Sequence, residues 1–177
     1  ADPAPPAEGR EGGRYYGDPR LDRRDHGFGG PLNSSDWLLL CRTVRFGDTD
    51  AAGVMHFHQL LRWCHEAYEE SLERFGISSA EIFPAPGHHL KLLLPITHCS
   101  ADYLAPLVCG DPLAIALQPL QLDPTAFEVS YRFSSDGKPV AQGLTRHQCI
   151  SASERKKTAL SVGMAHWLQA SAVSPNF

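Results

Sequence analysis

Two carboxylates lie two residues apart in a short, glycine-containing segment. They are Asp48 and Asp50, in the run Phe46-Gly47-Asp48-Thr49-Asp50, and Gly53 follows them. A carboxylate can attack a carbonyl carbon as a nucleophile, or it can deprotonate a water molecule that attacks in its place. A glycine permits a backbone conformation or a close approach that a side chain would block. The segment therefore holds groups suited to the hydrolysis of an acyl compound.

A long amphipathic helix is predicted directly after this segment, over residues 57–75, and Gly76 supplies a C-terminal cap. Its apolar residues recur at spacings of three and four: Leu60, Leu61, Cys64, Tyr68, Leu72 and Phe75. The first turn of a helix has free N–H groups and the positive end of the helix dipole, which can stabilise a carbonyl under attack. Alternatively, Asp48 or Asp50 only caps the helix and Gly53 only turns the chain.

The remaining periodic segments predict strands, because they are short, rich in apolar residues and separated by turn residues. The predicted strands cover residues 37–46, 92–103, 112–122, 126–133 and 140–151. The run Ser135-Asp136-Gly137-Lys138 is typical of a hairpin turn, and a short helix is predicted over residues 162–170. Consecutive strands favour antiparallel pairing, with the long helix over one face. The expected fold class is α+β.

Residues 1–36 differ in composition from the rest of the chain. They contain 7 Gly and 5 Pro among charges of both signs, with almost no aliphatic residues. Such a segment cannot bury enough apolar surface to offset its chain entropy. We therefore expect a disordered tail over residues 1–36 and a single folded domain over residues 37–177.

Composition excludes several classes of function. With 16 basic and 20 acidic residues the net charge is -4, which does not favour a nucleic-acid partner. No apolar stretch approaches the roughly 20 residues needed to cross a bilayer, so no membrane span is expected. The five cysteines form no Cys-x-x-Cys pair and the nine histidines form no His-x-x-x-His pair. We expect no metal, no cofactor and free thiols in the reducing cytoplasm.

The segment around Asp50 resembles the active-site motif of the 4-hydroxybenzoyl-CoA thioesterase family. In that motif a strand ends in Phe-Gly-Asp-x-Asp and is followed by two small residues, Gly, two aliphatic residues and an aromatic residue that opens a helix. Here the motif is Phe46-Gly47-Asp48-Thr49-Asp50-Ala51-Ala52-Gly53-Val54-Met55-His56-Phe57. Further similar stretches include Ala101-Asp102-Tyr103 and Leu144-Thr145-Arg146-His147, and the resemblance covers about residues 37–170.

The resemblance implies a hot-dog fold, in which an antiparallel sheet wraps around one long central helix. It also implies homodimers, often paired into homotetramers, with active sites at the dimer interface. The implied substrate is an aromatic acyl-CoA, and within the family the chain is most similar to the branch that acts on 1,4-dihydroxy-2-naphthoyl-CoA.

By position in the motif, Asp50 is the implied catalytic carboxylate, and the backbone N–H of Phe57 is the implied donor to the thioester carbonyl. Asp48 matches a motif aspartate that is usually not the catalytic one. The candidate substrate-binding residues lie near the helix start: Gly53, Val54, His56, His58 and Trp63. Glu66, on the helix, is a weaker second candidate for the catalytic carboxylate.

One departure from the family concerns the CoA phosphates. Aromatic thioesterases of this family bring a turn rich in Arg and Lys to these phosphates, but the corresponding turn here, residues 120–125, has no basic residue. Phosphate contacts would then come from Arg146 or from Arg155-Lys156-Lys157. Two alternatives stay open: a generic acyl-CoA or acyl-carrier-protein thioesterase, and a non-catalytic hot-dog dimer that binds acyl-CoA.

Overall fold

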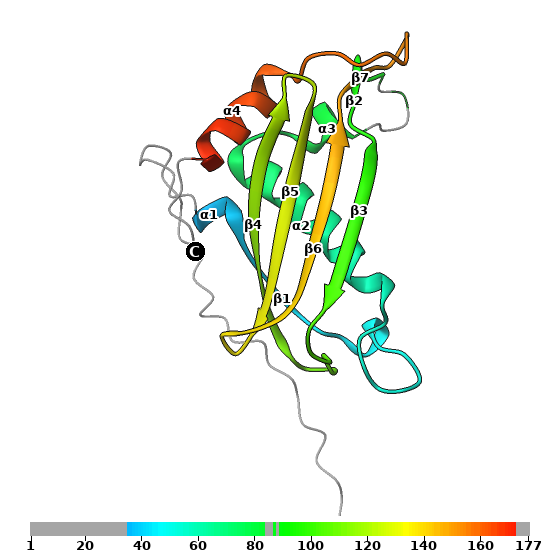
Figure 1. Ribbon diagram of the computed structural model, residues 1–177, viewed down its shortest axis with the longest axis vertical. Helices are drawn as coiled ribbons and strands as arrows, with labels where there is room; N and C mark the ends of the chain where they lie inside the picture. The colour runs from blue at the N-terminus through cyan, green and yellow to red at the C-terminus, as the bar shows by residue number, and fades with distance from the viewer. Residues whose placement is uncertain (1–34, 84–86, 88, 173–177) are drawn as a thin grey trace, which may run out of the picture. The chain divides into compact units, whose positions relative to one another are not determined.

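The computed structural model describes residues 35–83, 87 and 89–172 (Figure 1). The predicted tail therefore lies outside the described residues, except for Ser35 and Asp36. These two residues begin a short helix, α1 (Ser35–Leu38). The predicted boundary at residue 37 thus falls inside a helical turn.

Five antiparallel strands form the main sheet, in the order β1-β4-β5-β6-β3. They are β1 (Leu39–Thr43), β3 (Ile96–Tyr103), β4 (Pro112–Asp123), β5 (Ala126–Ser135) and β6 (Lys138–Gln148). A second, two-stranded sheet pairs β2 (Leu92–Leu93) with β7 (Ile150–Ser151). Two further helices, α3 (Ser79–Ile82) and α4 (Val162–Ala172), lie outside the sheets.

The long helix α2 (His58–Phe75) lies across one face of the main sheet, which curves around it (Figure 1). It ends at Gly76, whose left-handed φ of 99° matches the predicted C-terminal cap. The buried face of α2 comprises Gln59, Leu60, Trp63, Cys64, Ala67, Tyr68, Ser71 and Leu72. This sheet wrapped around a single long helix is the hot-dog fold, so the expected α+β class and architecture are confirmed.

The helix and the sheet approach each other closely at Gly143 of β6. A Cβ atom built at Gly143 would lie 2.6 Å from the Sγ atom of Cys64, closer than atoms in a packed interior come. Cys64 itself is fully buried, and burial raises the pKa of its thiol to about 12. A glycine is therefore required here by the separation between α2 and β6.

A buried polar chain crosses the same interior. The Tyr131 hydroxyl bonds to Thr145 Oγ1 at 3.0 Å, and Thr145 Oγ1 bonds to His147 Nε2 at 2.9 Å. The His147 ring stacks on Phe127, with ring centroids 4.6 Å apart. Burial lowers the pKa of His147 to about 4, so this ring is neutral at physiological pH. These residues form core packing and do not line the loop that contains Asp50.

Two of the predicted strands are interrupted. Residues 37–46 were expected as one strand, but Trp37 and Leu38 belong to α1 and are buried, while Phe46–Asp48 form a short 3-10 helix. The strand predicted over residues 92–103 is broken at Pro95 into β2 and β3, because proline has no N–H to donate to a ladder.

The last predicted strand is also divided, since residues 140–151 contribute to both β6 and β7, which lie in different sheets. The predicted hairpin turn between β5 and β6 is confirmed, with positive φ angles of 49° at Asp136 and 74° at Gly137. Among the described residues, no helix is both long and apolar enough to span a bilayer.

The contact between Gly143 and Cys64 gives a stability prediction. Replacing Gly143 with Ala should lower the free energy of unfolding by about 1–3 kcal/mol, because the added methyl group overpacks the interface. Combining it with Cys64→Ala, which removes the Sγ atom, should recover part of that loss in urea denaturation. Gly163→Ala is the control, since a Cβ there would meet Ile77 at an ordinary 3.8 Å. Additive losses in the double variant would contradict the steric explanation.

Candidate active site

The segment that carries Asp50 is anchored where β1 ends. The N–H of Val44 donates to the Asp111 carbonyl (3.0 Å), and the Val44 carbonyl accepts from the N–H of Gly110 (2.9 Å). Further on, the N–H of Met55 donates to the Leu107 carbonyl (2.7 Å). Both ends of the 45–54 segment are therefore held by the same short stretch, residues 107–111.

Asp48 has a structural task between these anchors. Its Oδ2 accepts the N–H of Arg45 (2.7 Å), which closes the 3-10 turn, and its carbonyl accepts the N–H of His56 (2.8 Å). The sequence allowed that Asp48 or Asp50 caps the long helix. Neither does, because the N-cap of α2 is Phe57, and no side chain caps the helix there.

Asp50 lies at the start of a tight, exposed loop. Its N–H donates to the Val54 carbonyl (2.9 Å), and its own carbonyl accepts the N–H of Gly53 (3.0 Å), which has a φ of 80°. Its Oδ1 accepts the N–H of Ala52 (2.8 Å), and its second carboxylate oxygen has no partner among the described residues. One oxygen is thus oriented by the backbone, and the other is free to react with a ligand.

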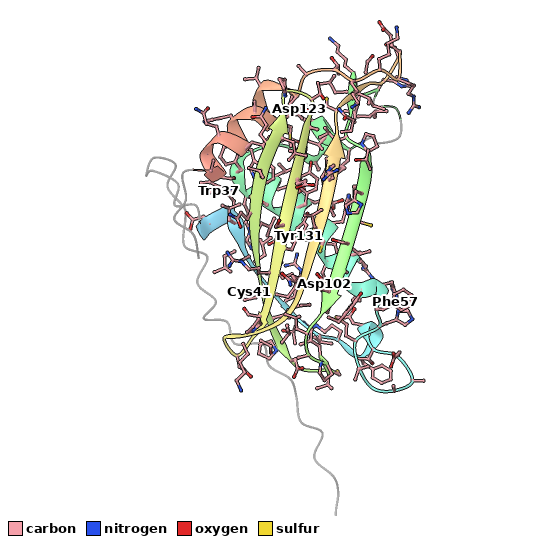
Figure 2. The ribbon with its side chains drawn as sticks, in the orientation of Figure 1. Trp37, Cys41, Phe57, Asp102, Asp123 and Tyr131 are labelled. Carbon is pink, nitrogen blue, oxygen red and sulfur yellow. The ribbon has the colours of Figure 1, made fainter. Side chains whose placement is uncertain are left out.

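The start of α2 presents an unpaired amide. The N–H of Phe57 makes no hydrogen bond with any residue the structure describes, and this residue is 70% exposed. The hydroxyl of Tyr103, at the end of β3, donates to the Phe57 carbonyl. Figure 2 shows Phe57 on the β3 side of the molecule and Cys41 on the β1 side. A free N–H at a helix start can stabilise a developing oxyanion.

Two histidines flank this amide. The rings of His56 and His58 contact each other through their Nδ1 atoms, and the ring centroids of His56 and Phe57 are 4.6 Å apart. Val54 pairs with Val108 in an isolated bridge. Six of the seven candidate residues therefore lie within one stretch of the chain, residues 50–58.

Trp63 lies apart from the other candidates. It is only 3% exposed and, with Arg45 and Asp48, lines a groove between β1 and α2. Glu66 lines the same groove, and its carboxylate pairs with Arg62 at 2.7 Å, one turn earlier on α2. This is an ordinary ion pair on a helix surface.

The basic residues considered for the CoA phosphates lie away from Asp50 in this chain. Arg146 pairs with Glu128 at 2.5 Å. The turn at residues 155–157 lies beyond β6, at the end of the sheet opposite the Asp50 loop (Figure 1). The turn at residues 120–125, which has no basic residue and contains Asp123, lies at that same distant end (Figure 2).

Two residues of this site were missed from the sequence. Tyr103 holds the start of α2 from β3, and Asp111 Oδ2 accepts the N–H of Val108 (2.8 Å) in the segment that anchors the loop. Both lie in the stretches of family resemblance, which was the only available signal. No group of three metal-ligating side chains occurs in the described part of the chain.

A sheet wrapped around one long helix, with a carboxylate in the loop before that helix, is the arrangement of a hot-dog thioesterase. The chain belongs to the thioesterase-like superfamily, whose sequence profile matches residues 44–168. It is 73% identical over 128 residues to a 1,4-dihydroxy-2-naphthoyl-CoA hydrolase of Synechococcus sp. strain RCC307, covering 72% of this chain and 98% of that one. It is 51% identical to the hydrolase of that name from Prochlorococcus marinus strain MIT 9303, covering 80% and 96%.

Solved structures agree with this assignment. A putative thioesterase from Prochlorococcus marinus MIT 9313 superposes with a TM-score of 0.77 at 50% identity, covering 79% of this chain and 99% of that one. A 1,4-dihydroxy-2-naphthoyl-CoA thioesterase from Synechocystis superposes with a TM-score of 0.69 at 35% identity, covering 75% and 95%. The predicted family and fold are therefore confirmed.

The position of Asp48 predicts a defect in stability. Asp48→Ala should lower the free energy of unfolding by about 0.5–2 kcal/mol, because the N–H of Arg45 loses its acceptor. Asp48→Asn should cost less, since the amide keeps an oxygen at that position. Urea denaturation measures both, and equal losses in the two variants would argue against a capping role.

Proposed function

We propose that this chain hydrolyses 1,4-dihydroxy-2-naphthoyl-CoA to the free acid and CoA, a step of phylloquinone (vitamin K1) biosynthesis. The observation that carries this proposal is the 73% identity to a 1,4-dihydroxy-2-naphthoyl-CoA hydrolase over 98% of that protein's length. The family profile matches residues 44–168, which include the Asp50 loop and the start of α2, so the family similarity covers the site as well as the fold.

Asp50 is the proposed catalytic carboxylate, acting as nucleophile or general base. As a nucleophile, its free oxygen attacks the thioester carbon, CoA leaves as the thiolate, and water hydrolyses the resulting anhydride. As a base, it takes a proton from a water molecule that attacks the same carbon. The bond from the N–H of Ala52 to Oδ1 supports both routes, because it orients the carboxylate without occupying its second oxygen.

The N–H of Phe57 is the proposed donor to the thioester carbonyl oxygen. It lies at the positive end of the helix dipole, where negative charge on that oxygen is stabilised. Tyr103 contributes by bonding to the carbonyl of the same residue, which restrains the orientation of Phe57. Gly53, Val54, His56 and His58 are the proposed contacts of the acyl group, whereas Trp63 is assigned below to a different site.

The proposed assembly is a homodimer paired through β3, with a homotetramer as the larger form. Seven of the eight residues of β3 are exposed, and this strand is an unpaired edge of the main sheet. An exposed edge of this length invites pairing with a second copy. Light scattering should give at least twice the monomer mass, and a monomer would contradict the proposal.

Antiparallel pairing of two β3 strands would set the Asp50 loop of one copy beside the opposite end of the other sheet. The basic turn at residues 155–157 lies at that opposite end (Figure 1). We propose that this turn meets the CoA phosphates across the dimer.

The free thiols support a cytoplasmic location, where cysteines stay reduced. Residues 1–36 are proposed to be dispensable for turnover.

Asp50→Asn should abolish nearly all turnover. The amide keeps the shape of the carboxylate, but it can neither attack the thioester nor accept a proton, so a loss of roughly 10²–10⁴ in kcat is expected. Thiol release from 1,4-dihydroxy-2-naphthoyl-CoA measures the rate, while circular dichroism and light scattering check the fold and assembly. Activity within a few-fold of the unmodified enzyme would exclude Asp50 as the catalytic group.

The acyl preference separates the proposed reaction from generic thioester hydrolysis. A site with hydrogen-bond partners for a ring hydroxyl should reject acyl groups that lack it. We expect a higher kcat/KM for 1,4-dihydroxy-2-naphthoyl-CoA than for benzoyl-CoA or octanoyl-CoA, and His58→Ala should narrow that difference. Equal turnover of octanoyl-CoA would leave only a generic thioesterase, and no thiol release at all would indicate a non-catalytic acyl-CoA binder.

A further inference from the structure

A groove of about 420 Å³ lies on the flank of α2 that faces β1. Its lining comes from the end of β1 and from Asp48 on one side, and from one face of α2 on the other. The lining residues are Cys41, Arg42, Thr43, Arg45, Asp48, Gln59, Arg62, Trp63 and Glu66. The volume is within the roughly 300–1,000 Å³ typical of small-molecule sites. Asp50 and Phe57 are not part of this lining.

Of the three arginines that line the groove, two form ion pairs with described residues and one, Arg45, does not. Arg42 pairs with Glu70 at 2.5 Å, and Arg62 pairs with Glu66 at 2.7 Å. The guanidinium of Arg45 has no acidic partner among the residues the structure describes. Arginine presents several donors in a planar fork that matches a carboxylate. One free guanidinium beside two carboxylates, Asp48 and Glu66, suits a single negative charge better than a doubly charged phosphate.

Two side chains of the groove have polar groups with no partner among the described residues. Gln59 and Trp63 are each only 3% exposed, and neither the Gln59 amide nor the Trp63 indole N–H bonds to a described residue. These polar atoms are not enclosed, because the fully buried polar atoms without a partner in the described chain are the Tyr68 hydroxyl and His147 Nδ1. The Gln59 amide and the Trp63 indole N–H are therefore open to a ligand on the wall of the groove. By contrast, the indole N–H groups of Trp37 and Trp167 both bond to serine hydroxyls.

We propose that this groove is a second ligand site that binds a small hydroxylated carboxylic acid as its monoanion. The carboxylate would pair with Arg45, and the body of the ligand would bond to Gln59 and Trp63. The acid released by thioester hydrolysis is of this chemical class. The identification of the ligand with that acid rests on the proposed function, whereas the site itself rests on the groove.

The three tryptophans of the chain provide a direct test. The intact enzyme is labelled with 5-fluorotryptophan, and its ¹⁹F spectrum is titrated with 1-hydroxy-2-naphthoate; Trp63→Phe assigns the Trp63 signal. We expect a saturable shift of that signal, with the Trp37 and Trp167 signals unchanged because their indoles are held elsewhere. Inorganic phosphate at the same concentrations should leave the Trp63 signal in place.

Two arginine variants locate the carboxylate. Arg45→Ala should weaken binding by roughly 10–100-fold, the loss expected for a charge-assisted hydrogen bond. Arg132→Ala is the matched control, since Arg132 is an exposed arginine on β5 and does not line the groove. It should change the affinity less than twofold.

The proposal is overturned if the Trp63 signal does not move, if phosphate moves it equally, or if the two arginine variants behave alike. A groove covered by another copy of the chain would give the first of these results. If 1,4-dihydroxy-2-naphthoyl-CoA is not hydrolysed while the Trp63 signal still responds through Arg45, the proposed function fails and the site stands.

Discussion

The packing of α2 against the inner face of the sheet is the constraint on which the rest of the structure depends. The helix buries eight residues, and at Gly143 the sheet comes so close to Cys64 that no side chain fits between them. This contact fixes how α2 lies across β6, and hence where its first turn emerges at the sheet edge. Because Phe57 is the N-cap of that helix, the direction of its free N–H follows from packing about two turns away.

The Asp50 loop is held to this frame from both ends. Residues 107–111 bind the end of β1 through Val44 and the start of α2 through Met55, so the loop spans two fixed points. Gly53 closes it with a positive φ angle, and Ala52 orients the carboxylate. The Asp50 carboxylate is thereby held in position without being buried, as the proposed access of a large acyl-CoA requires.

Short sequence patterns predicted the features that depend only on neighbouring residues, namely the long helix and the hairpin turn. The spacing of apolar residues gave α2 within one residue at its start, and Asp136-Gly137 gave the hairpin turn because both residues accept positive φ angles. The split of residues 92–103 into two sheets was not predicted, because the two halves pair with different partners far along the chain. Trp63 was expected beside the helix start, but it is buried on the flank of α2 that faces β1, and periodicity does not show which flank that is. The flank of α2 that faces β1 depends on the angle at which the helix crosses the sheet, which is set by contacts far apart in the sequence.

Asp48 makes contacts on both flanks of the helix, although it lies only eight positions before His56. Its side chain closes the turn at Arg45 beside the β1 groove, and its carbonyl holds the N–H of His56 beside the start of α2. The two interactions use different atoms of one residue, so neither can shift without moving the backbone that supports the other. A motif aspartate that is not the proposed catalytic group thus still has a physical reason to lie two residues before Asp50. Through these two bonds it connects the turn at Arg45 to the start of α2, between which the Asp50 loop lies.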